Sequence, residues 1–366
     1  MKNKIFRALI VLIVPLFFLG AGFLPGCDRS VDGGLFTTRD GGNTWEQKVF
    51  VSEKENIAKL NVFSIVIHPT EPNVIYLGTQ GKGVYKSSDS GGSFKRVLLN
   101  DVDIYSIAID PKDSNIVYAS SLSAANGKIY RSPNGFEETV EEILIEAREG
   151  QALKDVVVDP YDDSRIYAVS QQGGVFKSAD FGASWSVKKW FDAALTKIAV
   201  SQSDTRVIYV ASSDGGIFKT SDGGDTWLDF REEELPAVSE DEELKEGLLY
   251  SFPGANVVND IAVDPGNSDM VYAATDYGLL KSVDGGRFWK TVNSLVAPGT
   301  VPIKTVDLAS ESSNVIYISA GSSLHKSTDG GINWSNWLLP TVRRIEAVAI
   351  DPKDMQIVYV GVMKLK

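Results

Sequence analysis

The sequence predicts an all-β fold made of seven similar units, and two repeated patterns lead to this prediction. The first is a short turn motif, Ser/Thr-x-Asp-x-Gly-x-x-Trp/Phe, which occurs six times along the 366 residues. Its acidic residues are Asp40, Asp89, Asp180, Asp222, Asp284 and Asp329. A seventh copy, at Ser132–Phe136, stands at the right place but has lost the Asp and the second Gly. The second pattern is a pair of short runs rich in Val, Ile and Tyr, which alternates with the turn motif and occurs seven times.

The spacing of these units is typical of one architecture. Each pair of runs contains an Asp-Pro-like turn, whose marker residues are His68, Asp110, Asp159, Ser201, Asp264, Ala309 and Asp351. Successive markers are separated by 42, 49, 42, 63, 45 and 42 residues. Periods of about 40–50 residues with β-rich units are typical of β-propellers, which have four strands in each blade. The sequence therefore predicts a single seven-bladed β-propeller over residues 28–366, with no second domain.

Each position of the turn motif has a structural role. The Asp carboxylate can accept backbone N–H bonds within the turn, and the Gly permits the left-handed backbone that such a turn needs. The aromatic residue is large enough to cover the hairpin and to pack against a neighbouring sheet. We therefore expect the motif to fasten the turn between the third and fourth strands of each blade.

The fourth unit shows how one blade is expected to be built. Its strands are predicted at 195–200, 207–212, 216–220 and 226–230, with the innermost strand buried on both faces. The propeller itself begins with the third and fourth strands of a blade, at 34–37 and 46–51, and ends with a first and a second strand, at 345–350 and 356–362. We therefore expect one blade to be closed by strands from both termini, which removes the free sheet edges of an open ring.

Composition and charge narrow the possible partners. A hydrophobic content of 43% supports a packed core, and the formal net charge of −12 makes the surface repel phosphate backbones. Nucleic acid is therefore not an expected partner. An acidic loop insertion at about 230–256 lengthens one repeat, and Ser239 with Glu242 in it fits a capping box. This insertion is expected to form either a short helix or a solvated loop on the face where propellers usually bind ligands.

Residues 1–27 have the pattern of a targeting segment. A basic start with Lys2, Lys4 and Arg7 precedes an apolar run, and the segment ends at Cys27, the only cysteine. This resembles a bacterial lipoprotein signal, whose cleavage leaves a lipid-bearing N-terminal cysteine; a plain secretory signal or an uncleaved anchor is the alternative. We therefore expect a protein of the bacterial cell envelope, extracytoplasmic and lipid-anchored to the membrane at Cys27. A single cysteine also excludes disulfides within the chain.

The turn motifs and strand pairs resemble the Asp-box (BNR-repeat) β-propeller superfamily from about Gly33 onward. That superfamily includes sialidases, sortilin-type receptors, propeller xyloglucanases and the photosystem II stability/assembly factors. The chain resembles the assembly factors in its size, its blade count and its N-terminal cysteine. The residue pattern of its strand pairs resembles that of the sortilin and xyloglucanase types. The resemblance implies that the Asp-boxes are structural turns away from the ligand face.

Catalytic chemistry has little support in the residues. A sialidase needs an arginine triad with a Tyr nucleophile, whereas Arg343–Arg344 is the only arginine pair near an inner strand. The xyloglucanase resemblance implies paired acids in a cleft between two propellers, and one propeller is predicted here. Asp155, Asp260 and Glu346 begin inner strands. They are expected to form either a carboxylate pair for glycoside chemistry or solvated channel-lining acids, neutralised by Lys154, Lys197 and Lys304. No cofactor and no metal site are expected, because the sequence contains no recognisable dinucleotide-binding, phosphate-loop or metal-binding motif.

A binding surface remains the best-supported role. Residues at the start of the inner strands differ from blade to blade, unlike the apolar residues that follow them. These ligand-face candidates are Phe63, Tyr105, Lys154, Asp155, Lys197, Asn259, Asp260, Lys304 and Glu346. Their mixture of aromatic rings and both charges suits a protein or peptide partner and would also suit a glycan. The sequence thus predicts a non-catalytic assembly or scaffold factor that binds a protein; the alternative is a glycan-binding protein or glycoside hydrolase of the Asp-box type.

Overall fold

The computed structural model describes residues 32–98, 101–123, 125–231, 247–310 and 312–364. Asp32–Lys366 form one compact unit. The predicted signal segment with Cys27 lies outside the described residues, as do residues 232–246 of the acidic insertion with their predicted capping box. The described part of the insertion contains one short 3-10 helix, η1 (Leu249–Ser251). No helix in the described ranges has the length and apolarity that crossing a membrane requires.

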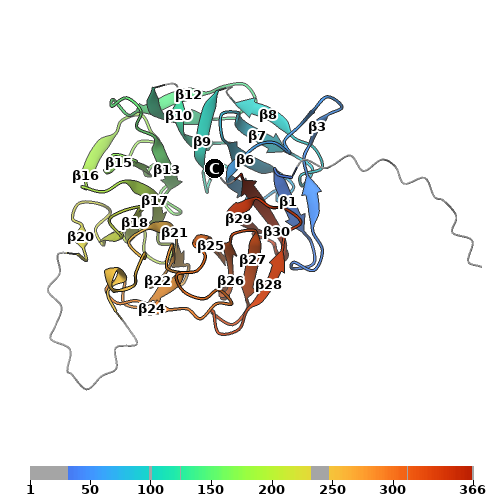
Figure 1. Cartoon of the computed structure of the whole chain (residues 1–366). Helices are drawn as coiled ribbons and strands as arrows, with labels where there is room; N and C mark the ends of the chain where they lie inside the picture. The colour runs from blue at the N-terminus through green and yellow to red at the C-terminus, as the bar shows by residue number, and fades with distance from the viewer. Residues whose placement is uncertain (1–31, 99–100, 124, 232–246, 311, 365–366) are drawn as a thin grey trace, which may run out of the picture. The chain divides into compact units, whose positions relative to one another are not determined.

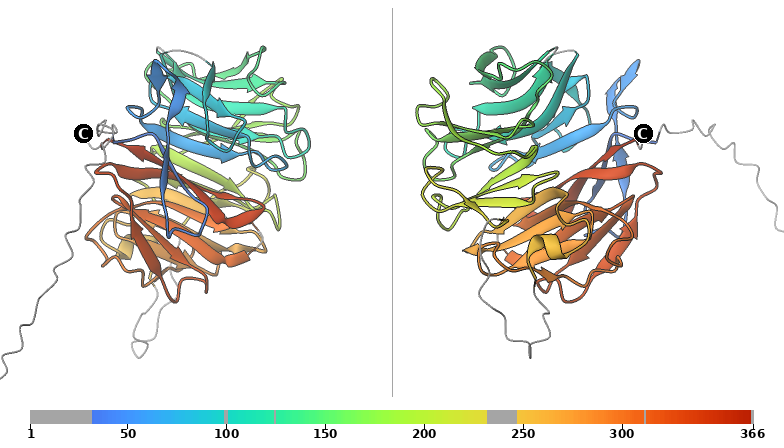
Figure 2. Two further views of the ribbon diagram at one scale, coloured as in Figure 1. Left: turned by 90° about the vertical axis from the view of Figure 1, so that its right-hand side faces the viewer. Right: turned by 60° about the vertical axis from the view of Figure 1, so that its left-hand side comes forward.

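Seven four-stranded antiparallel sheets surround a central axis (Figure 1), which confirms the predicted seven-bladed propeller. Figure 2 shows the same ring from two other directions. The first strands of neighbouring blades contact one another around the whole ring. Six blades consist of four consecutive strands, with these bounds: β5 (Val62–Ile67), β6 (Ile75–Thr79), β7 (Gly83–Ser87), β8 (Lys95–Leu98); β9 (Val102–Ile109), β10 (Val117–Ser123), β11 (Asn126–Ser132), β12 (Glu141–Ile145); β13 (Leu153–Val158), β14 (Ile166–Ser170), β15 (Gly174–Ser178), β16 (Ser186–Trp190); β17 (Leu195–Val200), β18 (Ile208–Ser212), β19 (Ile217–Thr220), β20 (Leu228–Asp229); β21 (Val258–Asp264), β22 (Asn267–Thr275), β23 (Leu279–Ser282), β24 (Lys290–Thr291); β25 (Ile303–Ala309), β26 (Ser312–Ala320), β27 (Ser323–Ser327), β28 (Ser335–Leu338).

The seventh blade is closed by both ends of the propeller, as predicted. Its two inner strands are β29 (Arg344–Asp351) and β30 (Asp354–Met363), and its two outer strands are β1 (Leu35–Thr38) and β2 (Glu46–Lys48). β1 pairs antiparallel with β30, so that Phe36 lies opposite Val360. The outer strand expected at 46–51 is split after β2, because residues from Phe50 onward form a separate hairpin of β3 (Phe50–Ser52) and β4 (Glu55–Asn56).

The second strand of a blade, and not the first, is the fully buried one. Every residue of β6, β14 and β18 is buried, whereas β17 buries only Leu195 and Ile198. The prediction that the innermost strand is buried on both faces is wrong, because these strands line a central cavity. The tyrosines of the second strands fill the space between blades and are all buried: Tyr76, Tyr118, Tyr167, Tyr209, Tyr272, Tyr317 and Tyr359.

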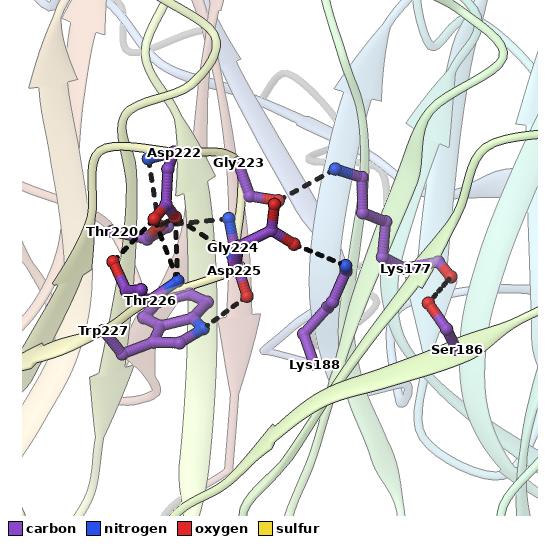
Figure 3. Close-up of polar contacts among 10 residues, drawn as sticks. All are labelled: Lys177, Ser186, Lys188, Thr220, Asp222, Gly223, Gly224, Asp225, Thr226 and Trp227. Carbon is purple, nitrogen blue, oxygen red and sulfur yellow. Dashed lines mark hydrogen bonds and ion pairs between the residues drawn. The ribbon is translucent and has the colours of Figure 1, made fainter.

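The turn motif of the fourth blade shows how an Asp-box works (Figure 3). Asp222 accepts the backbone N–H of Thr226 at 2.9 Å through Oδ1 and the Thr226 hydroxyl at 2.6 Å through Oδ2. The Thr220 hydroxyl donates to Asp222 Oδ1 at 2.7 Å and accepts the N–H of Gly224 at 3.0 Å. Gly223 and Gly224 have φ values of 73° and 99°, a region that suits glycine. The predicted role of the motif as a turn is confirmed.

The seventh, degenerate motif keeps the turn without the Asp. Asn134 Oδ1 accepts the Ser132 hydroxyl at 2.9 Å and the N–H of Glu138 at 3.4 Å. The Ser132 oxygen accepts the N–H of Phe136 at 2.8 Å. Phe136 stands where other copies have the second Gly, and it takes a φ of 63°. The amide oxygen of Asn134 thus takes the place of the carboxylate. Its contact with the N–H of Glu138 is longer than the 2.9 Å contact between Asp222 and Thr226.

Lysines of the preceding blade hold the turn motif of the next one. Lys177 Nζ donates to the backbone oxygen of Gly223 at 2.9 Å, and Lys188 Nζ lies 2.7 Å from Asp225 Oδ1 (Figure 3). Lys177 also lies over the ring of Tyr167, 5.2 Å from its centroid. On the face of the propeller that carries the turn motifs, these contacts therefore join adjacent blades.

Candidate binding site in the central cavity

A central cavity of about 710 Å³ lies between the inner strands of the blades. Its wall includes residues of β5, β9, β13, β17, β21, β25 and β29, so every blade contributes to it. This volume lies within the range of pockets that hold small molecules, which is about 300–1,000 Å³. The cavity can therefore admit a small ligand or the side chains of a peptide segment.

A β-bulge near the start of each inner strand aims a side chain at this cavity. In every blade the pairing of the first two strands shifts by one residue at the same place, as between Leu195 and Lys197 in the fourth blade. A bulge places two residues opposite one and redirects a side chain. The residues at the seven bulges, which we call the rim, all line the cavity: Phe63, Tyr105, Lys154, Thr196, Asn259, Lys304 and Glu346.

The structure places eight of the nine sequence candidates on the cavity wall: Phe63, Tyr105, Lys154, Lys197, Asn259, Asp260, Lys304 and Glu346. Asp155 is not among the lining residues and is 5% exposed. Sequence reasoning missed Thr196, which occupies the fourth bulge where Lys197 was expected. Aligning Leu195 with Leu153 would have found it, because both are the buried residue directly before a bulge.

One side of the rim, from the first three blades, is aromatic and cationic. The rings of Phe63 and Tyr105 are stacked, with centroids 5.2 Å apart and an interplanar angle of 13°. Lys154 Nζ lies over the Tyr105 ring, 3.6 Å from its centroid. Burial lowers the pKa of Lys154 to about 8, although the carboxylates of Glu346 and Asp103 act in the opposite direction. This side presents a half-buried pair of stacked rings with an ammonium group over one of them.

The other side of the rim is a closed polar network. Lys304 Nζ donates to Asn259 Oδ1 at 2.8 Å and lies 3.1 Å from Asp276 Oδ1. Asn259 Nδ2 donates to the same Asp276 oxygen at 2.9 Å and to a backbone carbonyl of the next blade at 2.9 Å. In the seventh blade, Glu346 accepts a hydrogen bond from Arg344 Nε at 2.8 Å. These polar groups therefore satisfy one another.

Lys197 neutralises one of the predicted acids. Its Nζ lies 3.8 Å from Asp260 Oδ1. Burial alone lowers the pKa of Lys197, but the surrounding carboxylates, Asp260 first, outweigh burial and raise it. Lys154 and Lys304 form no ion pair with any of the three acids predicted at the inner strands. The expectation that these lysines neutralise the acids thus holds for Lys197 alone.

Asp307 is a cavity-lining acid that sequence reasoning missed. Its Oδ2 accepts the N–H of Ile350 in the next blade at 3.3 Å, and burial raises its pKa to about 7. Asp260 and Asp155 likewise accept N–H groups from the next blade, at 3.1 and 3.0 Å. These carboxylates link the inner strands of adjacent blades. The sequence did contain a sign of this role, because Asp307 is an acid at a strand position where the other units have Val or Ala.

Metal binding has no candidate among the residues that the structure describes, since no group of three or more His, Cys, Asp or Glu is arranged to hold an ion. His68 fills an Asp-Pro-type turn, where its Nδ1 accepts the N–H of Glu71 at 3.0 Å. His325 is buried in β27. The two histidines therefore serve the fold.

The chain is similar to known proteins in part of its sequence and in its fold. A family model described as Sortilin-Vps10 (sortilin, neurotensin receptor 3) matches residues 33–171. No curated protein matches the chain. The GH74 xyloglucanase from Xanthomonas campestris is 19% identical with a TM-score of 0.66, and the match covers 91% of this chain and 52% of the xyloglucanase. YCF48 from Cyanidioschyzon merolae is 12% identical with a TM-score of 0.59, covering 82% of this chain and 95% of YCF48.

A structure of YCF48 bound to D1 peptide matches in the same way, with 12% identity, a TM-score of 0.59, and coverage of 83% and 94%. This chain therefore spans about half the length of the xyloglucanase and nearly all of the YCF48 chains. At such low identities the likeness shows the fold alone, and function has to be argued from the residues of the site. The seven closed blades and the turn motifs show that the chain is a seven-bladed β-propeller with Asp-box turns, and the similar solved structures share its fold.

Proposed function

We propose that this protein is a non-catalytic binding protein, lipid-anchored on the extracytoplasmic side of a bacterial membrane, whose rim binds a protein or peptide partner. The observation that carries the proposal is the rim itself. Seven inner strands of similar sequence present aromatic, cationic, hydroxyl, amide and acidic side chains at one level of a single cavity. Varied side chains on a regular scaffold are the usual basis of specific recognition.

The likeness to a peptide-bound propeller supports a peptide partner. One similar structure is YCF48 bound to D1 peptide, and its fold covers 83% of this chain. The rim also combines half-buried aromatic rings with charges of both signs, a mixture that suits a protein-binding surface. By this analogy of fold, we infer an assembly or scaffold role for this chain.

The position of Asp32 supports a partner near the membrane. Its carboxylate accepts the N–H of Val342 at 2.9 Å, in the loop that leads into β29. Loops into the inner strands lie on the rim face, so the chain enters the propeller on that face. Cys27 precedes Asp32 by five residues, which span at most about 18 Å when extended. A lipid on Cys27 would therefore keep the rim face within reach of proteins at the membrane surface.

Glycan binding or glycoside hydrolysis is the second candidate function. The likeness to a GH74 xyloglucanase favours it. The pKa of Asp307, raised to about 7 by burial, also favours it, because a general acid must hold its proton near neutral pH. The engagement of Asp260 with backbone N–H groups of its own and the next blade weighs against a free catalytic pair.

Capture of envelope proteins by the purified propeller tests the first proposal. The rim variant replaces the two rim lysines, Lys154 and Lys304, together with Lys197 of the cavity wall, by Gln. The control replaces Ile332, which is 78% exposed on the turn-motif face, by Gln. We expect the rim variant to lose at least about tenfold of the partner bound by the wild type, and the control to keep it. Unchanged binding of the same partner by the rim variant would rule out the rim.

Incubation with a panel of plant and microbial polysaccharides tests the second candidate. The first proposal predicts no release of reducing ends by the wild type. Release of reducing ends that disappears in Asp260→Asn would overturn the non-catalytic proposal and establish a hydrolase.

A further inference from the structure

We infer that the aromatic side of the rim is a subsite for a carboxylate that the peptide partner carries next to an apolar side chain. Phe63, Tyr105 and Lys154 form this subsite. The inference rests on the proposed binding function and adds the chemistry of one contact. The carboxylate comes from an acidic side chain or from the C-terminus of the partner.

Lys154 is the rim lysine without an anionic partner. Its Nζ contacts the face of the Tyr105 ring, 3.6 Å from the centroid, and within the described ranges no carboxylate or hydrogen-bond acceptor pairs with it. Lys304 has two polar partners within 3.1 Å, and Lys197 lies 3.8 Å from a carboxylate. The charge of Lys154 is therefore the one that this protein leaves open to a ligand among the three lysines of the cavity.

The carboxylates that act electrostatically on Lys154 or lie beside it already have partners. Asp103 accepts a backbone N–H at 2.7 Å and the Tyr105 hydroxyl at 3.4 Å. Glu346 accepts a guanidinium N–H at 2.8 Å. Asp155 accepts two backbone N–H groups, each at 3.0 Å. Because these groups are committed to the scaffold, a carboxylate for Lys154 has to come from outside.

The surroundings make such a contact favourable. An ammonium group that is partly removed from water gains more from a charge-assisted hydrogen bond than one in bulk solvent. The rings of Phe63 and Tyr105, on adjacent blades, stack on each other and line the cavity. An aromatic or aliphatic side chain of the ligand can pack against the part of this ring pair that faces the cavity. A single short segment therefore reaches both the rings and the ammonium group.

The binding must depend on the protonation of Lys154. Burial lowers its pKa to about 8, and the groups that act on it are the carboxylates of Glu346 and Asp103 and the ammonium of Lys197. The charged form prevails below about pH 8 and the neutral form above it. We therefore expect affinity for a carboxylate to be constant between about pH 6 and 7 and to fall above pH 8.

Three defined peptides test the inference by titration calorimetry at pH 7. One is a capped peptide with adjacent Phe and Asp, one ends in Phe with a free C-terminal carboxylate, and one is a capped, uncharged peptide with adjacent Phe and Asn. We expect at least one charged peptide to bind about tenfold or more tightly than the uncharged one, a difference of about 1.4 kcal/mol. The charged peptide that binds better identifies the source of the carboxylate.

Variants of Lys154 separate this contact from a general effect of charge. Lys154→Met is expected to abolish the preference, and Lys154→Arg to retain it. The matched control is Lys281→Met, because Lys281 also lies over a tyrosine, 5.1 Å from the ring centroid of Tyr272, but outside the cavity wall. The control should keep the preference. Equal binding of charged and uncharged peptides, or a preference that survives in Lys154→Met, would overturn the subsite.

Two further outcomes distinguish the subsite from the proposed function. If partner capture is lost in the triple lysine variant but unaffected in Lys154→Met, the subsite is wrong and the rim proposal stands. If an oligogalacturonate binds through Lys154 and none of the peptides does, the assignment to a peptide is overturned in favour of a glycan.

Discussion

At the residue scale, His325 is where one blade departs from the others. It occupies the third-strand position that Tyr85, Phe176 and Phe218 hold elsewhere. The side chain is 3% exposed, and both ring nitrogens lack a hydrogen-bond partner among the described residues. Burial lowers the pKa of His325, so the folded protein holds the imidazole neutral. Two buried polar atoms without partners are a cost to stability.

Replacing His325 with Phe is expected to raise the free energy of unfolding by about 1–2 kcal/mol at pH 7. Because the pKa is lower in the folded state, the wild type should also lose stability as the pH falls below 6.5, and the variant should lack this loss. Urea unfolding at pH 7 and pH 5 measures both effects. The reverse change, Phe218→His, should destabilise. A variant no more stable than the wild type would contradict the account of His325.

Asp307 supplies a second prediction at this scale. Its pKa is about 7 in the folded state, against 3.8 for an ordinary Asp. The folded protein therefore holds a proton that the unfolded chain has released, and stability falls as the pH rises from about 4 to 7. Asp307→Asn lacks this loss, so it should be more stable than the wild type by about 2 kcal/mol at pH 8, with water in the cavity moderating the cost of the charge. Denaturant unfolding across pH 4–8 measures the difference. A constant difference would show that the carboxyl titrates normally.

At the element scale, the Asp-box turns act as hydrogen-bonded clamps. Bonds from the Thr44 hydroxyl and N–H lower the pKa of Asp40 to about 2, and the N–H of Asn333 does the same for Asp329. A lowered carboxyl pKa means stabilisation that is fully present above about pH 4 and is lost as the pH falls towards 2. The turns are therefore expected to fail together in acid.

Asp222→Asn tests one clamp. We expect a loss of about 1 kcal/mol in the free energy of unfolding at pH 7, because a neutral amide accepts the N–H and hydroxyl of Thr226 more weakly than the carboxylate does. The difference should shrink as the pH falls from 4 to 2. Asp225→Asn is the control, since Asp225 makes only an exposed contact with Lys188, worth less than about 0.5 kcal/mol. Equal losses in both variants would contradict the clamp.

The elements were predictable because their signals are local. The Asp-box residues lie within eight positions of one another, so that a turn such as Thr220–Trp227 can be read directly from the chain. Counting these turns and the strand pairs predicts seven blades. The closure of the ring also followed, because the strands at 34–37 and 345–362 supply the missing halves of one blade.

The chemistry of the rim was less predictable because it depends on contacts between blades. The bulge adds a residue to each inner strand and breaks the alternation of side chains between the two faces of the strand. The sequence prediction therefore named Lys197 as the rim residue where the structure has Thr196. That Lys154 lacks a carboxylate depends on where Asp103 and Glu346 turn in the fold. That Asp307 holds a proton depends on its burial between two blades. None of these facts is contained in the spacing of residues.

At the scale of the whole molecule, the blade that closes the ring is also the blade at which the chain enters the propeller. β1 pairs with β30, and Asp32, just before β1, contacts the loop into β29 on the rim face. The five-residue step from Cys27 to Asp32 would keep a lipid on Cys27 within about 18 Å of this contact. The turn motifs lie on the other face, where they join neighbouring blades.

Cys27→Ser tests the anchor. Without a thiol the lipid cannot be attached, and a single acyl-bearing cysteine is the anchor that the proposal assumes. We expect the wild type to sediment with membranes and to enter the detergent phase of a phase separation, and the variant to remain in the aqueous phase. Immunoblotting of the two phases is the measurement. Equal partition of both proteins into detergent would contradict lipidation at this residue.

Photo-crosslinking in the source cells tests the central claim, that the rim and not the turn-motif face binds the partner. A benzophenone amino acid is placed at Thr196, an uncharged rim position, or at Ile332 on the opposite face. The account predicts that irradiation yields a defined protein adduct from position 196 and none from position 332. The same adduct from position 332, with none from position 196, would contradict it.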